Sequence, residues 1–180
     1  SKLTQLYCCP YDALAMSASN FTGQNLGAGK YDRIRQGAYV CILLGAIYSV
    51  FQLLITQFGT RYAILLFAAP EEAAHVLPYA QQLSSMDAYF ALALLLVDVL
   101  RLSIQGMGYS RLSLFSGLLE MTARTVVSLW AIPRYGYTAA CLANASAWVL
   151  ADCFLIPAFY GCLRARCRQA ERVRRELPTE

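Results

Sequence analysis

The chain has 180 residues, of which 58% are hydrophobic and only 14% are charged. Soluble domains usually carry about a quarter of charged residues, so this composition excludes a water-soluble globular domain and predicts an all-α integral membrane protein. The net charge of +4 comes mainly from basic residues that flank apolar segments, which excludes nucleic acid as a partner.

Five apolar segments are long enough to form transmembrane helices. Each is close to the roughly 20 residues that cross a hydrocarbon layer of about 30 Å, and we expect the spans at residues 3–21, 38–58, 88–107, 112–132 and 138–160. The first is the weakest, because Pro10, Asp12 and several hydroxyl side chains dilute it. The expected organisation is a helical membrane bundle over residues 1–163, followed by a basic tail over 164–180.

The connections between these spans are predicted to be short, with one exception. Glycines mark the connections at 27–37 and 106–111, and proline and glycine mark the turn at 133–137. The longest connection covers residues 68–87, within which residues 73–83 form either a short interfacial helix or an early turn of the third span.

Basic residues are distributed unevenly between the two ends of the spans. Three lie on one side, Lys2, Arg61 and Arg134, and ten lie on the other, Lys30, Arg33, Arg35, Arg111, Arg164, Arg166, Arg168, Arg172, Arg174 and Arg175. Because cytoplasmic ends carry the excess of Lys and Arg, we expect a multi-pass plasma-membrane protein whose C-terminus is cytoplasmic. An odd number of spans with an external start implies either that further sequence precedes the chain or that the first segment is not a span.

Three of the spans carry polar side chains at helical spacing, which places them on one face of each helix. An isolated charge at the membrane centre costs roughly 3 kcal/mol on insertion scales, so these faces are expected to point inward and to line a transport pathway. The candidate residues are Asp98, Arg101 and Gln105 in the third span, Glu120 and Arg124 in the fourth, and Asn144 and Asp152 in the fifth.

The charged candidates are expected to play different parts. Glu120 and Arg124 are spaced i, i+4 and are more simply explained as an ion pair than as substrate contacts. Arg101 has two possible partners, Asp98 and Glu120, which makes Asp98 an acid with an ambiguous partner and therefore a candidate carrier of a proton or cation. Asp152 lies nearer the inner end of its span and is interpreted as a hydrated residue.

The sequence contains no pattern that is typical of a metal site, a cofactor site or an enzyme active site. The seven cysteines include no CxxC pair, and the single histidine, His75, has no neighbouring cysteine or histidine with which to form a metal site. A membrane enzyme would also need a nucleophile paired with a base. We therefore expect no enzyme activity, no bound metal and no cofactor other than a coupling ion, Na⁺ or H⁺.

The glycine-rich segment from Gly23 to Lys30 superficially suggests a phosphate-binding loop. That motif needs a glycine where Gln24 stands and a serine or threonine where Tyr31 stands. We interpret the segment as a closely packed helix end, in which Gly23 and Gly27 share a small-residue face. The residues of this expected signature loop are Gly23, Gln24, Asn25, Gly27 and Gly29.

Four segments in order resemble the multidrug and toxic compound extrusion (MATE) transporters. Residues 19–35, SNFTGQNLGAGKYDRIR, resemble the signature at the end of the second helix of a MATE lobe. RLSIQGMG at 101–108, SGLLE at 116–120 with Arg124, and GYTAACLANASAW at 136–148 resemble later segments of the same lobe. The chain departs from the family pattern at Leu102, where asparagine is common, and at Asp98, where an apolar residue is common.

The resemblance implies a fold of two six-helix lobes with a cavity between them, of which this chain would be the C-terminal lobe from about the eighth helix onward. It implies exchange of drugs or organic cations for Na⁺ or H⁺, with membrane lipids and an N-terminal lobe as further partners. It also carries over Arg101, Gln105, Glu120 and Arg124 as matching motif residues, whereas Asp98 rests on its polarity alone.

Two alternative functions remain open at this point. A related flippase for lipid-linked oligosaccharides would need a more basic cavity to hold a pyrophosphate, whereas acids and bases are nearly balanced in these spans. The other alternative is a membrane fragment that does not transport. Further apolar spans encoded upstream of Ser1 would argue against it.

Overall fold

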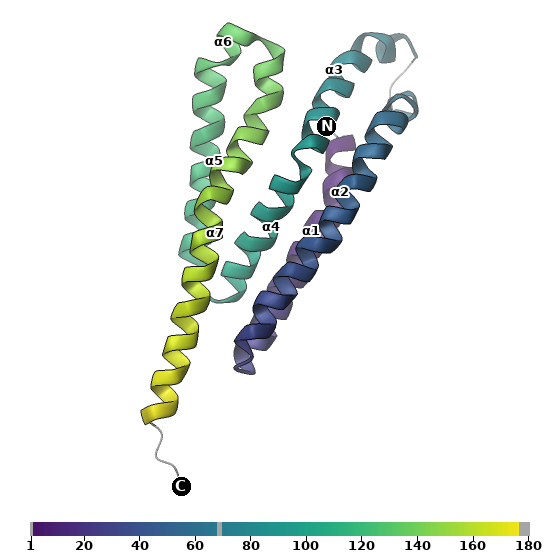
Figure 1. The fold of residues 1–180 in the computed structure, drawn as a ribbon. Coiled ribbons are helices and arrows are strands. Elements are labelled where there is room, and N and C mark those ends of the chain that lie inside the picture. Colours follow the sequence, from purple (N-terminus) through teal and green to yellow (C-terminus); the bar gives the residue numbers. More distant parts are fainter. Residues whose placement is uncertain (1, 68–69, 177–180) are drawn as a thin grey trace.

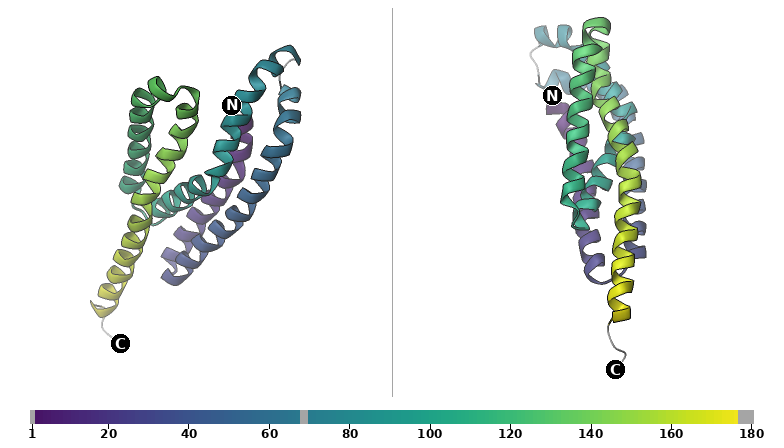
Figure 2. Two further views of the ribbon diagram at one scale, coloured as in Figure 1. Left: turned by 45° about the horizontal axis from the view of Figure 1, so that its top comes forward. Right: turned by 90° about the vertical axis from the view of Figure 1, so that its left-hand side faces the viewer.

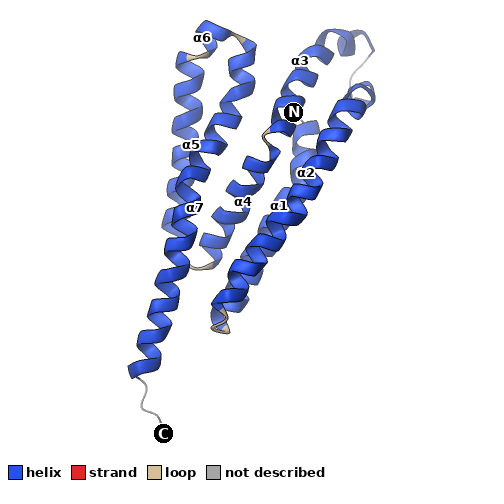
Figure 3. Cartoon of the chain, viewed as in Figure 1, coloured by secondary structure: helices blue, strands red, loops and turns tan. Residues whose placement is uncertain are grey.

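The computed structural model describes residues 2–67 and 70–176, and in these ranges the chain forms helices joined by short turns, with no strand (Figures 1 and 3). This confirms the predicted all-α fold class. The helices are α1 (Lys2–Gly27), α2 (Tyr31–Phe67), α3 (Pro70–Tyr89), α4 (Ala91–Gly106), α5 (Ser110–Trp130), α6 (Ile132–Tyr135) and α7 (Tyr137–Glu176).

The helices are arranged as two groups with α4 between them. α1 and α2 form an antiparallel pair, which α3 extends at one end, and α5 and α7 form a second antiparallel pair connected through α6 (Figures 1 and 2). α4 contacts α1 and α2 on one side and α7 and α5 on the other. Its residues therefore face both groups, which makes α4 the central element of the bundle.

Several helices have the length and composition of membrane spans. α2, α5 and α7 are each long and apolar enough to cross a membrane. Residues 81–89 and 91–106, bent by 56° at Phe90, add a fourth if the pair forms one broken span. In the part of the chain that the structure describes, α1 is a helix but is not among these candidates. The five spans and their bounds therefore stay a prediction.

The helices differ from the expected spans mainly at their ends. α2 begins at Tyr31 and continues through residue 59, so the connection expected at 27–37 shrinks to residues 28–30. α3 occupies most of the connection expected at 68–87, and α7 continues through the expected tail to Glu176. The length of an apolar run predicts only the part of a helix that lies in lipid. The helix itself can extend further through polar residues, so its ends differ from those of the apolar run. Residues 68–69 and 177–180 of these expectations lie outside the described residues.

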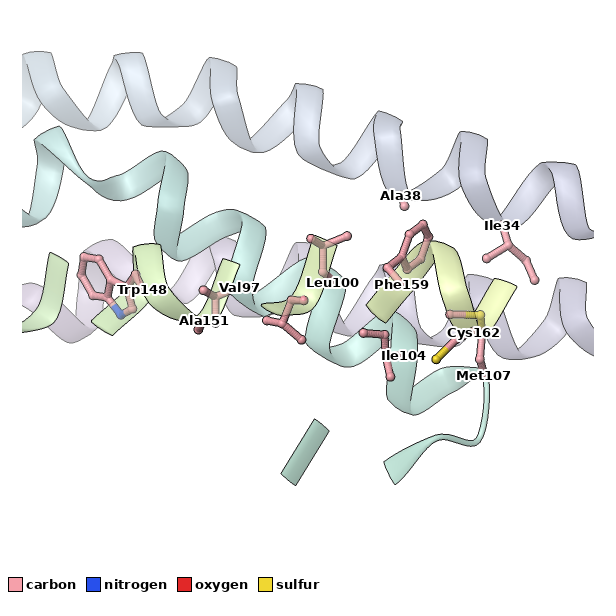
Figure 4. Packing of buried hydrophobic residues seen from close by; sticks show 11 residues of the cluster. Ile34, Ala38, Val97, Leu100, Ile104, Met107, Trp148, Ala151, Phe159 and Cys162 are labelled. Atoms are coloured by element: carbon pink, nitrogen blue, oxygen red, sulfur yellow. The ribbon is translucent and has the colours of Figure 1, made fainter. Parts of the chain in front are cut away.

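Two clusters of buried side chains meet on α4. Val97, Leu100 and Ile104 pack against α2 and α7, where Ala151 and Phe159 face them (Figure 4). On the other side of α4, the cluster consists of Ala91, Leu95 and Val99 with Tyr11, Ala15 and Ala18 of α1. Alanines on α1 and α7 let the helix backbones approach closely, as is typical of membrane bundles.

Candidate functional site

A charged cluster connects α4 and α5 near the middle of the bundle. Arg101 donates from Nη2 to Asp98 Oδ1 at 2.8 Å and from Nη1 to Glu120 Oε2 at 3.4 Å. Arg124 Nη2 lies 4.0 Å from the same oxygen of Glu120. Arg101 thus contacts both acids that the sequence offered as its partners, and it links two helices through them.

The acids of this cluster are more deeply placed than the bases. The side chains of Asp98 and Glu120 are 13% and 11% exposed, compared with 26% for Arg101 and 42% for Arg124. A buried carboxylate is costly unless it is paired. The two acids therefore depend on guanidinium groups that reach them from the more open side.

Asp152 of α7 brings a third carboxylate to the same region. It is 7% exposed, so it is not the hydrated residue that its position in the sequence suggested. Its Oδ1 atom has no hydrogen-bond partner among the described residues, and the group interacts electrostatically with Glu120 and Asp98. With all groups ionised, three carboxylates face two guanidinium groups, which leaves the cluster one negative charge in excess.

Two of the predicted site residues lie elsewhere. Asn144 is hydrogen-bonded to Asp87, where α7 packs against the end of α3. Gln105 is exposed beside the turn that follows α4. The structure therefore brings together Asp98, Arg101, Glu120, Arg124 and Asp152, but not the other two candidates.

Sequence reasoning missed one buried acid, which lies beside Asn144 at the end of α3. Asp87 is 8% exposed and Ser84, one turn earlier, is 6% exposed, although both fell in an expected connection. A continuous helix would place Asp87 and Asp98, which are 11 residues apart, on one face, but the 56° bend at Phe90 puts them on two differently directed helices. Asp12 of α1 also interacts electrostatically with Asp98, so acids of three other helices, α1, α5 and α7, act on this carboxyl group.

The expected signature loop forms the C-terminal end of α1. Gly29 has φ +67°, Lys30 N–H donates to Asn25 O at 2.9 Å, and Gly29 N–H donates to Leu26 O at 3.1 Å. This pattern is a Schellman motif, in which a left-handed glycine ends the helix. The Asn25 side chain is 8% exposed and donates to Phe21 O at 2.8 Å. These contacts account for the segment as a helix end and not as a phosphate loop.

A second Schellman motif ends α4 at the same end of the molecule. Gly108 has φ +88°, and Tyr109 N–H donates to Ile104 O at 3.1 Å. Arg166 of α7 donates from Nε and Nη2 to the carbonyl oxygen of Met107, at 3.1 and 2.7 Å. The turn is therefore bound to the extended part of α7.

Glycines also let α1 and α4 cross closely. A Cβ atom added to Gly106 would lie 2.6 Å from Ser19 O, and one added to Gly23 would lie 3.8 Å from Gly106 O. Gly27, the other glycine of the expected small-residue face, has open space around it. The close contact is thus made by Gly23 and Gly106, which join the first two segments of the family resemblance.

The first 130 residues match the family model described as MatE. The chain belongs to the MATE family. The matched region contains both Schellman motifs and the acids and bases of α4 and α5, while Asp152 of α7 lies beyond it. MATE proteins are transporters rather than enzymes. No curated protein and no solved structure matches the chain.

Proposed function

We propose that this MATE chain serves cation-coupled antiport, in which drugs or organic cations leave the cell in exchange for Na⁺ or H⁺. The chain would act as the C-terminal lobe beside an N-terminal lobe, with access alternating between the two sides of the plasma membrane. Family membership and the buried charged cluster on α4, α5 and α7 support this proposal.

The observation that carries the proposal is the buried carboxyl group of Asp152 beside Asp98 and Glu120. Arg101 contacts Asp98 and Glu120. Among the described residues, no guanidinium group contacts Asp152. A proton or Na⁺ bound here neutralises the excess negative charge of the cluster. A cationic substrate binds better when that ion has left, so each species promotes release of the other, as reciprocal coupling requires.

The net charge of the cluster also favours one class of substrate over another. Its excess of negative charge suits an organic cation better than the pyrophosphate of a lipid-linked sugar. Glu120 and Arg124 are assigned the structural role, because they complete the network around Arg101.

The test compares Asp152→Asn and Asp98→Asn with Glu171→Gln, which removes an acid from the exposed part of α7. Uptake of a fluorescent organic cation into everted vesicles, where an exporter pumps towards the lumen, is measured for the complete transporter under an imposed Na⁺ or H⁺ gradient. We expect the first two variants to reduce gradient-driven uptake by about 5–150-fold, the usual range of coupling factors between two ligands. Undiminished coupling in both would contradict the proposal.

A further inference from the structure

A narrow apolar groove of about 170 Å³ lies between α2, α4 and α7, in the half of the molecule nearer the C-terminal end. Ile42, Leu96 and Ile156 line it, one from each helix. Ala38 and Phe159, which lie close together in Figure 4, are its buried part. Its outer side continues into the exposed apolar face of α2, so the groove opens where lipid is expected.

The groove has a polar mouth. The hydroxyl groups of Tyr39 on α2 and Tyr160 on α7 are hydrogen-bonded to each other at 2.6 Å, and both side chains are exposed. One hydroxyl proton is used within this pair, and the other is free to donate to a ligand. None of the residues that line the groove is acidic.

Two arginines lie one helical turn beyond this tyrosine pair. α2 and α7 run in opposite directions (Figure 1), so Arg35, four residues before Tyr39, and Arg164, four residues after Tyr160, both lie on the C-terminal side of the pair. Both arginines are exposed, and Arg35 interacts electrostatically with Tyr160. The mouth therefore combines up to two guanidinium groups with a free hydroxyl donor.

We propose that this groove binds an anionic phospholipid. One acyl chain lies along Ile42, Leu96 and Ile156, and the phosphate lies against Arg35 and Arg164 with the tyrosine pair donating to it. Guanidinium groups match phosphate oxygens in pairs, and basic pockets between membrane helices bind anionic headgroups. This site is separate from the charged cluster and does not depend on the coupling ion or the transported substrate.

The volume of the groove distinguishes a lipid chain from a drug. Pockets that enclose drug-sized ligands measure about 300–1,000 Å³, which is more than this groove offers. A cavity of about 150 Å³ lined by aliphatic and aromatic side chains holds a molecule the size of benzene. A short stretch of acyl chain therefore fits, while the rest of the lipid remains in the bilayer.

The test titrates the purified chain in dodecyl maltoside micelles with dioleoyl phosphatidylglycerol or dioleoyl phosphatidylcholine, and counts retained lipids by native mass spectrometry. We expect preferential retention of phosphatidylglycerol, with affinity about fivefold weaker for each of Arg35→Gln and Arg164→Gln. Arg168→Gln, which removes an exposed arginine one turn further along α7, should change it little. Equal retention of the two lipids, or an equal loss in Arg168→Gln, would overturn the proposal.

Three further measurements distinguish binding in the groove from general charge attraction. Ile156→Trp enlarges a side chain that is 42% exposed on the wall of the groove, and it should abolish specific retention without removing a charge. Arg35→Lys keeps the charge but loses the paired contacts of the guanidinium group, so it should weaken retention, though less than Arg35→Gln. Glycerol 3-phosphate, which carries the phosphate without acyl chains, should not displace the lipid. Retention that survives Ile156→Trp, or displacement by glycerol 3-phosphate, would show that the groove is not the site.

Discussion

Arg101 is the residue that holds the charged cluster together, because its two terminal nitrogens contact acids on two helices. Without it, Asp98 loses its guanidinium partner, and Glu120 keeps only the 4.0 Å contact with Arg124. Arg101 is partly exposed, so water screens some of this interaction. Its main contribution is to prevent two largely buried carboxylates from facing each other unpaired.

Arg101→Gln should therefore lower the stability of the bundle by about 2 kcal/mol, the range for hydrogen bonds to charged groups. Unfolding in detergent micelles, followed by circular dichroism, measures the change. Asp98→Asn in the same chain should recover part of the loss, because one of the unpaired acids is then neutral. Strictly additive effects of the two substitutions would show that Arg101 and Asp98 do not interact.

Gly106 and Gly117 provide a matched pair of glycines within helices. A Cβ atom at Gly106 would press against Ser19 O, whereas one at Gly117 meets nothing within 4 Å. Gly106→Ala should cost about 1–3 kcal/mol through overpacking, and Gly117→Ala should add about 0.4–1 kcal/mol by stabilising α5. The melting temperatures of the two variants in detergent compare them directly, and equal shifts would argue against the close crossing of α1 and α4.

At the scale of helices, the sequence predicted which elements exist better than where they begin and end. Long apolar runs located α2, α5 and α7, because a helix is the simplest structure that satisfies backbone groups in lipid. The 56° bend at Phe90 carried no local signal, since neither proline nor glycine lies beside it. Pro78, in contrast, lies inside α3 without ending that helix.

The candidate site was predictable only in part, for a related reason. Spacing along one helix identified Asp98 with Arg101 and Glu120 with Arg124, which are local pairs. Spacing placed Asp152 on a polar face expected to point inward, but how deeply it is buried depends on how α5 and α7 pack, which spacing along one helix does not determine. Contacts between helices that are distant in the sequence could not be predicted from spacing within each helix.

The extended end of α7 is attached to the turn after α4 through Arg166. Its guanidinium donates twice to Met107 O and lies 4.9 Å from the centre of the Tyr109 ring. Arg166→Gln should release this part of α7 and raise its rate of amide hydrogen exchange at least about tenfold, equivalent to the roughly 1.5 kcal/mol of a charged hydrogen bond. Arg168→Gln is the control, and equal exchange in both variants would show that the contact does not hold α7.

At the scale of the whole molecule, the distribution of basic residues and the order of the helices predict the same orientation in the membrane. The turns at residues 28–30 and 107–109 and the C-terminal end of α7 lie at one end of the bundle, and α6 lies at the other (Figures 1 and 2). Lys30, Arg111 and Arg164 belong to the first end, whereas Arg134 belongs to the second. This distribution supports the proposed cytoplasmic position of the C-terminus.

The proposed orientation can be measured with reporters fused to the C-terminus. Green fluorescent protein should fluoresce there, and alkaline phosphatase, which needs an oxidising compartment for its disulfides, should stay inactive. Fusion of the same reporters after Tyr135, in α6 at the opposite end, should reverse both results. Active phosphatase at the C-terminus would place the basic end outside the cytoplasm.

The turn that ends α4 constrains how this gene can change. Gly106 has no room for a Cβ atom, and Gly108 combines a left-handed backbone with the guanidinium of Arg166, 2.8 Å from where its Cβ would lie. Every single-base substitution of a glycine codon that still encodes a different amino acid adds at least that one carbon. Only synonymous base changes therefore leave these two positions unstrained. The obstacle at Gly106 is the backbone carbonyl of Ser19, which every residue at position 19 would keep, so substitution of that neighbour cannot make room for a side chain.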